Sequence, residues 1–522
     1  MIQSIRIQNL RSLKDTGYIR IKPLTILLGA NSSGKSTFLR SFPLLTQSVK
    51  KNLRGPISWF DDSLVDFGDY NTAKNRFAGK KDSIKFSFHI TSPFRFNTGI
   101  RYVLDRVMYI GDSQFNDAKM TISFYYDTKG TFVRSIRLIL DDIRVYIYVN
   151  ERNDVLKFKY NQEEIELPNM WRWNNNTSSN ILPSFVTERE DGTSIQDFYQ
   201  VNIISLAAFL LNKCDKRLKS KDRLVPDILR WKKDKQAYLE YLQEKGGTAS
   251  LRHLASSWTI ESPEYLELYD KIATVNAIAM IPILDREISD FYSRCSYIAP
   301  TRAEANRFYR TQGLQVSDID PYGKNLEEFL SSLTNAQMQN YNEFIEKLLN
   351  INIKTTSSAG HHSIELVTAN GNYNMADVGF GYSQLLPIVT KLWYVAYRSR
   401  IHQKNRKGYQ YREMSNLLTA IEQPELHLHP AYQAKVADAF LQILDQTHNG
   451  DEPFKLLVET HSQTMINRIG RRVREGRLGV GEVNVILFEK KQGQQNTEIR
   501  QISFDKNGQL KDWPYNFFDP ED

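Results

Sequence analysis

A glycine-rich segment at residues 29–37 carries the residue types that bind the phosphates of a nucleotide. Its sequence, GANSSGKST, fits the pattern G-x-x-x-x-G-K-[ST] at every fixed position. In such a loop the backbone N–H groups wrap the phosphates, the lysine reaches the β- and γ-phosphates, and the next hydroxyl holds Mg²⁺. Lys35 and Ser36 are the candidates for these two roles. The predicted ATP-binding residues of this P-loop are Gly29, Asn31, Ser32, Ser33, Gly34, Lys35, Ser36 and Thr37.

The segments on both sides of the loop predict the strand and the helix that must position it. Residues 23–28 form an apolar run typical of a buried strand, and apolar residues from Phe38 to Leu45 recur at helical spacing. A helix that begins at the loop points the positive end of its dipole at the phosphates. Arg11 lies in a predicted turn between two short upstream strands. It is either a further nucleotide contact or a solvated turn residue.

A second candidate group begins at an apolar run that ends in an acid. Residues 417–421 predict a buried strand, Glu422 follows it, and Pro424 comes two residues later. A P-loop ATPase needs such a carboxylate for the Mg²⁺ water shell, at the end of a strand beside the P-loop strand. Ser36 and Glu422 are therefore the predicted metal site. His427 and His429 could also be metal ligands, but no third ligand cluster is evident, which favours buried or capping roles.

Length and composition limit the classes to which the chain can belong. Its 522 residues, 41% hydrophobic and 25% charged, are typical of a soluble globular protein of two or three domains. Only two cysteines are present, so no disulfide framework is expected. No stretch reaches the ~18 apolar residues of a membrane span, so we expect a cytoplasmic protein with no membrane partner. The net charge of +8 allows a nucleic-acid partner without requiring one.

Changes in the hydrophobic pattern predict an ATPase head that is interrupted by a long insertion. Residues 1–70 and 295–522 form its two parts, because strands and helices alternate again after the insertion and argue for one parallel sheet. Between them, residues 71–200 alternate with period two and predict an antiparallel β-rich lobe, and residues 201–294 predict a helical insertion. The expected fold class is an α/β P-loop ATPase head with these two additions.

A basic stretch lies within the predicted helical insertion. Residues 213–235 carry ten Lys or Arg against four Asp. They form either a surface for DNA, RNA or another partner, or a solvated helix face. The interspersed acids favour the solvated face.

Several motifs resemble the ABC-class ATPases of the SMC and OLD (overcoming-lysogenization-defect) lineage. Residues 421–430, IEQPELHLHP, resemble the second nucleotide motif of that lineage. Residues 377–387, DVGFGYSQLLP, resemble its signature motif, and residues 459–462, ETHS, resemble its switch-histidine motif. Residues 297–302, YIAPTR, are similar to a Tyr-x-x-Pro-x-Arg element of prokaryotic members, and the tail at 512–519 is similar to the ending of a bacterial subgroup.

The resemblance implies roles for residues that lie far from the P-loop in the sequence. The signature motif docks on the γ-phosphate held by a second subunit, which would assign Gly379, Gly381 and Ser383 to ATP binding. Its usual Ser-Gly-Gly-Gln core is not reproduced here. His461 would sense the γ-phosphate.

The second nucleotide motif departs from the family pattern at one catalytic position. Gln423 stands where a glutamate normally polarises the attacking water, and glutamine is a poor general base. Either Glu425 or another group substitutes, or hydrolysis is slow. The predicted catalytic set is Glu422, Gln423, Glu425 and His461.

The resemblance implies an ATPase that dimerises head to tail around two ATP molecules with Mg²⁺. Length and motif order are similar to the ATPase subunits of anti-phage defence systems (Septu, PARIS and retron-associated modules), which restrain a separate nuclease or toxin effector. A self-contained OLD-type nuclease is disfavoured, since the roughly 60 residues after His461 show no Toprim-like acid set. The alternative is a DNA repair or chromosome-maintenance ATPase that binds DNA directly, which the basic stretch at 213–235 would support. No long heptad coiled coil accompanies it.

Overall fold

The computed structural model describes most of the chain. The basic stretch at 213–235, except for its last two residues, and the tail at 512–519 lie outside the described residues. The described residues are 2–51, 53, 55–91, 101–102, 107–108, 117–127, 130–141, 143–150, 155–161, 163–165, 172–174, 181–182, 184–188, 195–197, 206, 234–246, 249–310, 316, 318–358, 360–404, 416–448, 453–490 and 496–511.

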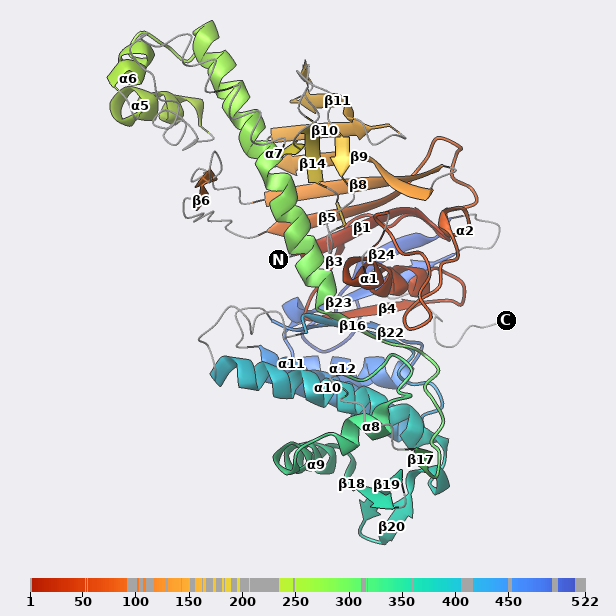
Figure 1. Cartoon of the computed structure of the whole chain (residues 1–522). Coiled ribbons are helices and arrows are strands. Elements are labelled where there is room, and N and C mark those ends of the chain that lie inside the picture. The colour runs from red at the N-terminus through yellow and green to blue at the C-terminus, as the bar shows by residue number, and fades with distance from the viewer. Residues whose placement is uncertain are drawn as a thin grey trace. The chain divides into compact units, whose positions relative to one another are not determined.

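The chain groups into two compact units (Figure 1). Unit 1 comprises residues 1–3, 51–57 and 83–289. Unit 2 comprises residues 4–50, 58–82 and 290–522, and therefore holds the P-loop together with every described motif downstream of residue 295.

A six-stranded sheet holds the P-loop in unit 2. Five of its strands run parallel, and β24 pairs antiparallel at one edge. Strands from both sides of the insertion share this sheet, which confirms the prediction of an interrupted parallel sheet. In spatial order the strands are β16 (Cys295–Ile298), β21 (Leu418–Glu422), β22 (Lys455–Glu459), β4 (Leu24–Gly29), β23 (Val483–Glu489) and β24 (Glu498–Ile502).

One prediction about this sheet is wrong, namely that the strand ending in Glu422 lies beside the P-loop strand. Strand β22 lies between them, pairing with β21 on one side and with β4 on the other. Sequence order does not determine spatial order in a parallel sheet, because each strand is linked to the next by a crossover helix that can span a neighbour. The intervening strand β22 itself ends in an acid, Glu459.

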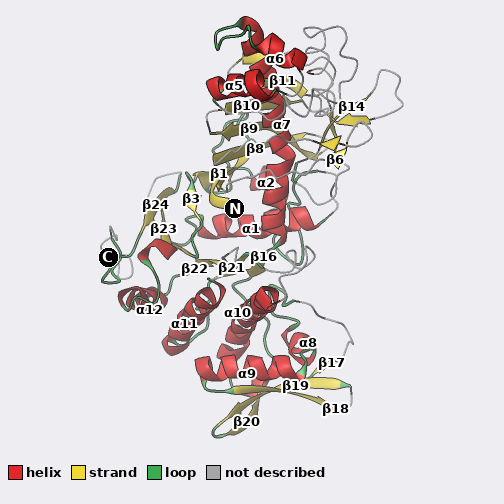
Figure 2. Ribbon diagram, turned by 90° about the vertical axis from the view of Figure 1, so that its left-hand side faces the viewer, coloured by secondary structure: helices red, strands yellow, loops and turns green. Residues whose placement is uncertain are grey.

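Helices cover both faces of this sheet (Figures 1 and 2). Helix α1 (Lys35–Lys50) begins in the P-loop and packs on one face against β16 and β21. Helices α10 (Phe380–Lys404), α11 (Pro430–Thr447) and α12 (Gln463–Arg474) pack side by side on the other face. Alternate residues of β4, Leu24, Ile26 and Leu28, join the apolar core on the α10–α12 side. The result is the helix–sheet–helix layering of an α/β protein.

Smaller elements complete unit 2. Strands β19 and β20 form a hairpin and pair antiparallel around the turn at residues 369–370. The predicted strands upstream of the P-loop also pair antiparallel, β1 with β2 and with β3. These elements are β1 (Ile2–Leu10), β2 (Leu13–Asp15), β3 (Ile19–Arg20), α2 (Tyr70–Ala73), β17 (Tyr309–Arg310), α8 (Leu326–Ser331), α9 (Asn335–Leu349), β18 (Asn352–Ser358), β19 (His361–Thr368), β20 (Gly371–Asn374), η2 (Met375–Asp377) and η4 (Val480–Glu482).

Unit 1 is built on an antiparallel sheet, as its alternating sequence predicts. The sheet order is β12-β11-β10-β9-β8-β5, with alternate residues buried along β8, β9 and β10. Its elements are β5 (Ile84–Thr91), β6 (Arg101–Tyr102), β7 (Val107–Met108), β8 (Asp117–Asp127), β9 (Gly130–Leu140), β10 (Ile143–Val149), β11 (Val155–Tyr160), β12 (Glu163–Ile165), β13 (Arg172–Asn174), β14 (Ser184–Glu188), β15 (Ile195–Asp197), α5 (Lys235–Lys245), α6 (Ala249–Ala255) and most of α7 (Pro263–Ser293).

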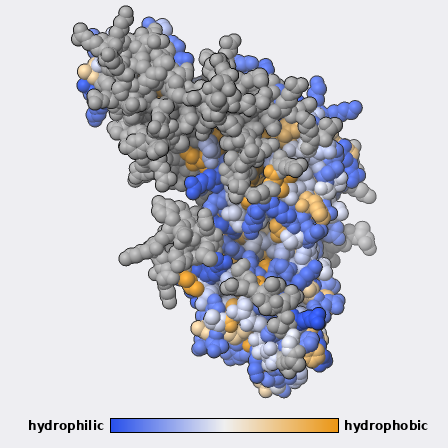
Figure 3. Space-filling model, in the orientation of Figure 1, coloured by the Kyte–Doolittle hydropathy of each residue, from blue (hydrophilic) through white to orange (hydrophobic). Residues whose placement is uncertain are grey.

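The described surface is predominantly polar in the view of Figure 3, where hydrophobic residues form small, separated patches. Among the described residues, none of the helices combines the length and the apolar character that a membrane crossing requires.

Candidate functional site

A cavity of about 1260 Å³ lies beside the P-loop in unit 2. It is lined by residues 31–37 of the loop, by Arg11, and by Gln423, Glu459 and His461, among others. The structure therefore brings together most of the residues that the sequence singled out for nucleotide binding, although they come from three distant parts of the chain.

Two glycines allow the P-loop to take its shape. The backbone of Gly29 has φ +151°, and a Cβ atom there would lie 2.3 Å from the backbone oxygen of Phe488. Gly34 has φ +101°, and a Cβ atom there would lie 2.7 Å from a methyl carbon of Leu13. Any other residue at either position would combine backbone strain with a steric clash. The predicted strand and helix on the two sides of the loop are confirmed as β4 and α1.

Lys35 and Ser36 lie at the first turn of α1, next to the cavity. The Lys35 ammonium donates to the backbone oxygens of Gly29 (3.0 Å) and Ala30 (2.8 Å). Burial lowers its pKa, although the nearby carboxylates of Glu459 and Glu425 oppose this shift. The Ser36 hydroxyl donates to Oε1 of Glu459 at 2.8 Å. The acid in contact with Ser36 is thus Glu459, and not the expected Glu422.

Glu459 is a buried acid at the end of β22, only 2% exposed. Its Oε2 atom has no hydrogen-bond partner among the described residues. Burial, together with the charge of Glu422, raises the pKa of Glu459 to about 7, while the hydrogen bond from Ser36 and the charge of Lys35 oppose this rise. An orphaned carboxylate oxygen beside a serine hydroxyl is a donor set that fits a hard cation such as Mg²⁺.

A dedicated protein cage for a metal is absent from the described part of the chain. No group of three or more His, Cys, Asp or Glu side chains that could hold an ion is found there. Magnesium in nucleotide sites does not need such a cage, because phosphates and waters supply most of its ligands and one or two carboxylates suffice. The residues present therefore fit Mg²⁺ bound together with a nucleotide.

Glu422, the predicted metal-binding acid, is engaged by other side chains. Its carboxylate accepts two hydrogen bonds from Arg40, from Nε to Oε1 at 2.7 Å and from Nη2 to Oε2 at 2.8 Å. Oε1 accepts a further one from the Tyr297 hydroxyl at 2.8 Å. The hydrogen bonds with Glu422 raise the pKa of Arg40, although burial opposes that shift. Both carboxylate oxygens of Glu422 are therefore occupied within the protein.

The other predicted catalytic residues divide between the cavity and its supporting turn. Gln423 lines the cavity, and its N–H donates to the backbone oxygen of Glu459 at 2.9 Å. Glu425 lies behind the cavity wall, where its carboxylate accepts from the Thr460 hydroxyl (2.8 Å) and from the N–H of His461 (2.6 Å). Burial raises the pKa of Glu425. Its contacts show that this side chain holds the turn that carries His461.

His461 is one of the residues that line the cavity. Nε2 is buried and has no hydrogen-bond partner among the described residues. Burial, with the charge of Lys35 as a second cause, lowers the pKa of His461. The lowered pKa favours the neutral imidazole, and Nε2 is the ring nitrogen left for a ligand.

The predicted signature residues lie at the start of α10, and within the described chain none of residues 379–383 lines the cavity. Gly379 has φ +84° with open space around its Cα, and Phe380 is 41% exposed. A Cβ atom at Gly381 would meet only the backbone oxygen of His427, at 4.0 Å. The Ser383 hydroxyl donates to the backbone oxygen of Phe380 at 2.7 Å. The exposed part of this segment is thus free to meet another molecule.

A buried arginine connects this segment to the acid motif, which the sequence did not predict. Gln384 exchanges two hydrogen bonds with the backbone of Arg302, donating to its oxygen (3.0 Å) and accepting from its N–H (3.1 Å). The Arg302 guanidinium in turn donates to the backbone oxygen of Ala299 (3.1 Å) and lies 3.5 Å from those of Glu422 and Gln423. Burial lowers the pKa of Arg302 to about 10. The Tyr-x-x-Pro-x-Arg element therefore lies between the signature helix and the acid motif.

The remaining predicted residues have partly structural roles. Arg11 lines the cavity, but its guanidinium also donates to the backbone oxygen of Asp66 (2.9 Å) and stacks over the ring of Phe67 (4.2 Å). His429 caps the start of α11, where its Nδ1 atom accepts from the N–H of Ala431 at 3.3 Å. This confirms a capping role for that histidine.

Two residues of this site, Glu459 and Arg40, were not singled out from the sequence. Glu459 follows an apolar run and precedes the Thr-His-Ser segment, so the pattern that pointed to Glu422 could have pointed to it as well. Arg40 carries no such signal, because its partner lies 382 residues away in the sequence.

The fold and the site define an α/β P-loop nucleotide-binding protein. The chain matches the AAA ATPase domain family over residues 1–466, and it therefore belongs to that family. The predicted fold class is thus confirmed as a split P-loop ATPase head with an antiparallel β lobe and a helical insertion. No curated protein matches the sequence.

Three solved structures of Smc heads are similar to the chain at a low level. A Smc head bound to the C-winged helix domain of ScpA has a TM-score of 0.36 and 11% identity, covering 96% of this chain and 98% of that one. The Smc head of Pyrococcus furiosus with an extended coiled coil, bound to the C-terminal domain of ScpA, has a TM-score of 0.32 and 12% identity, covering 96% of both chains. The Smc head of Thermotoga maritima has a TM-score of 0.32 and 7% identity, covering 96% of this chain and 98% of that one. At these scores the likeness supports no statement about partners.

Proposed function

We propose that this protein is an ATPase that closes head to tail around two ATP molecules and so controls a separate effector. The observation that carries this proposal is the position of residues 379–383. They are exposed in part, and none of them is among the described residues that line the P-loop cavity of their own chain. A second copy could bring its segment to this cavity, and the exchange of identical surfaces would close a two-fold dimer.

The residues around the cavity divide the work of ATP binding. The P-loop N–H groups and Lys35 bind the phosphates, and Ser36 with a neighbouring carboxylate would hold Mg²⁺, which screens the phosphate charge when bound. His461 can donate a hydrogen bond to the γ-phosphate through Nε2 when that nitrogen carries the proton. The partner's α10 start would supply backbone N–H groups and the positive end of a helix. Because each ATP site takes one half from each chain, ATP binding would favour the closed arrangement of the two chains.

Slow hydrolysis is part of the proposal. Gln423 can orient a water molecule but cannot readily accept its proton. Glu425 is a poor substitute base, since both of its carboxylate oxygens are occupied by Thr460 and His461. ATP would therefore be held for long periods, which suits a clamp that keeps an effector in check.

The effector that we propose is a nuclease or toxin of an anti-phage defence system, encoded separately. The support is the similarity of length and motif order to the ATPase subunits of such systems, which is an argument by analogy. Pull-down of the tagged full chain from its native host, with and without ATP, tests it. A nuclease or toxin that co-purifies and is lost or rearranged with nucleotide is the expected result. If the tagged protein purifies without a partner both with and without ATP, the proposal of a separate effector is contradicted.

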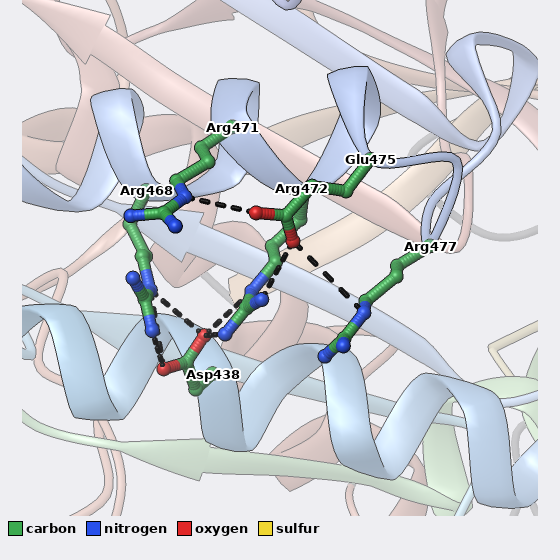
Figure 4. Close-up of polar contacts among 6 residues, drawn as sticks. All are labelled: Asp438, Arg468, Arg471, Arg472, Glu475 and Arg477. Carbon is green, nitrogen blue, oxygen red and sulfur yellow. Dashed lines mark hydrogen bonds and ion pairs between the residues drawn. The ribbon is translucent and has the colours of Figure 1, made fainter.

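The second candidate function is an ATPase that binds DNA or RNA directly. Arginines of α12 and the residues after it form a cluster with two acids, and Figure 4 shows their ion pairs. Arg471 and Arg477 are 57% and 68% exposed, so this surface keeps positive charge toward solvent. Basic residues in a last helical turn also stabilise the helix dipole, which is a structural explanation of the same cluster. The members drawn in the figure are Asp438, Arg468, Arg471, Arg472, Glu475 and Arg477.

A mixing experiment tests the composite site directly. Lys35→Ala removes the phosphate-binding lysine, and Gly381→Glu places a negative charge where the partner's γ-phosphate would lie, at a position with room for a side chain. Each variant alone is expected to lose ATP hydrolysis. In an equal mixture about half of the dimers are mixed and hold one intact site of two, so about a quarter of wild-type activity should return. Gly381→Ala is the matched control and should stay active.

Either of two results contradicts the head-to-tail arrangement. One is a mixture that is no more active than the sum of its components. The other is a wild type whose mass in solution does not double with ATP under conditions where ATP binds. The second candidate function would be favoured by strong DNA affinity that decreases as the salt concentration rises. The affinity should also decrease in the Arg471→Ala and Arg477→Ala variants.

A further inference from the structure

We propose that Arg302 is a positioning residue, which holds the backbone of Gln423 in the shape that brings its side chain to the ATP cavity. The inference rests on the proposed ATP site, and it gives a role to the Tyr-x-x-Pro-x-Arg element, which the proposed function leaves without one. Three features of the structure support it: the strained backbone of Gln423, the contacts of the buried Arg302 guanidinium, and the hydrogen bonds that fix Arg302 to α10.

Gln423 has a backbone conformation that a residue other than glycine rarely adopts. Its φ is +40°, in the left-handed region, where the Cβ atom crowds the backbone. A residue keeps such a conformation only where the surrounding contacts fix it. Its N–H donates to the backbone oxygen of Glu459 (2.9 Å), and its own backbone oxygen accepts from the N–H of Leu426 (3.1 Å). Because Gln423 also lines the cavity, the direction of its side chain depends on how firmly this turn is held.

The buried guanidinium of Arg302 lies against the same turn. One of its nitrogens, Nη1, donates to the backbone oxygen of Ala299 at 3.1 Å and lies 3.5 Å from those of Glu422 and Gln423. Three carbonyl oxygens therefore converge on one nitrogen of a cation. The attraction between a charge and these dipoles is stronger in a buried site than in water, so Arg302 helps to fix the backbone at Gln423.

Fold stability alone does not explain a buried arginine at this place. The residue is 2% exposed, and its Nε and Nη2 atoms have no hydrogen-bond partner among the described residues. Burial lowers the pKa of Arg302 to about 10, while the charge of Glu425 opposes this shift, so the guanidinium stays charged at neutral pH. A buried charge with so few partners is less favourable than an apolar side chain of similar volume. Support of the turn that carries Gln423 gives the charge a purpose.

Arg302 is itself fixed by α10. The amide of Gln384, a fully buried side chain, donates to the backbone oxygen of Arg302 (3.0 Å) and accepts from its N–H (3.1 Å). Gln384 directly follows the segment 379–383, which the proposed function brings to the partner's ATP. Arg302 therefore connects the start of α10 to the turn of Gln423.

The test compares ATP turnover with nucleotide affinity in the full-length protein. Turnover is measured as release of labelled phosphate, and affinity with a fluorescent non-hydrolysable ATP analogue. Arg302→Met removes the guanidinium and keeps much of the apolar stem. Its turnover should fall about 10- to 100-fold, as for a misplaced catalytic group, while its affinity for the analogue should change less than about threefold. Arg302→Lys keeps the charge on a single nitrogen and should restore part of the lost turnover.

A double-mutant cycle separates positioning of Gln423 from a general structural role. Gln423→Ala removes the side chain that Arg302 is inferred to position, and it should lower turnover by itself. In that background Arg302→Met should have little further effect, because residues that act as a unit are not additive. Arg294→Met is the matched control and should leave turnover unchanged. Arg294 is also buried, at 4% exposed, but it lies at the other end of β16 and pairs with Asp290 at 2.9 Å.

The failure of this inference differs from the failure of the ATP site. Arg302→Met turnover equal to that of wild type overturns the inference, and so does an equal loss with and without the Gln423 side chain, while Lys35-dependent hydrolysis remains. If Arg302→Met does not fold, as judged by circular dichroism, Arg302→Lys is carried through the same cycle with the same criteria. Wild-type protein that hydrolyses ATP no faster than Lys35→Ala overturns the ATP site itself.

Discussion

Replacing Arg40 with methionine would leave the Glu422 carboxylate buried with one hydrogen bond, from the Tyr297 hydroxyl. Methionine keeps most of the apolar stem of the arginine, so the change removes mainly the guanidinium. Removing one partner of a buried ion pair costs about 3–5 kcal/mol. The Arg40 side chain is 34% exposed, and solvent screening therefore lowers our expectation to about 2–3 kcal/mol.

Local hydrogen exchange is the assay that suits this magnitude. A chain of two units does not unfold in one step, so a single free energy of unfolding is not well defined. Exchange read by mass spectrometry on peptides from β21 and α1 reports local opening instead. A loss of about 2–3 kcal/mol corresponds to exchange about 30- to 150-fold faster in these peptides. Peptides from β9 and β10 in unit 1 are the internal control and should not change.

A double-mutant cycle shows whether the effect comes from the pair. Glu422→Gln alone should destabilise the same peptides, while the double variant with Arg40→Met should lose less than the sum of the two changes. We expect an interaction energy of about 1–2 kcal/mol. Additive effects, or exchange in the Arg40→Met variant equal to that of wild type, would refute the structural role of Glu422.

Two further predictions concern catalysis and pH. Gln423→Glu supplies a general base at the cavity and should raise ATP turnover about 10- to 100-fold, measured as phosphate release, with Lys35→Ala in the same background as the inactive control. Burial raises the pKa of Asp285 in unit 1 to about 8, from 3.8, so its stabilising contribution is present below pH 3.8 and is lost as the pH rises to 8. Asp285→Asn should therefore gain stability over wild type by up to about 1.4 kcal/mol per pH unit in this window, by urea unfolding followed through exchange in α7. A pH-independent difference would contradict the assignment.

The sequence alone determined the P-loop, its strand and its helix. A phosphate is bound there by the backbone of consecutive residues, so nine adjacent positions contain the whole signal, and Gly29 and Gly34 stand where the backbone admits no side chain. Period-two alternation likewise predicted the antiparallel sheet of unit 1, because strand residues point alternately to the two faces.

Only the tertiary structure decided which acid meets the P-loop. Ser36 and Glu459 are 423 residues apart in the sequence, and they meet because β22 takes the place between β4 and β21. Both Glu422 and Glu459 end apolar strands, so the local pattern could not distinguish them. The difference arises from contacts made in the folded chain, where Arg40 and Tyr297 bind the carboxylate of Glu422, whereas one oxygen of Glu459 has no partner among the described residues. Strand order is set by how crossover helices pack against a sheet, and no local stretch of sequence carries that information.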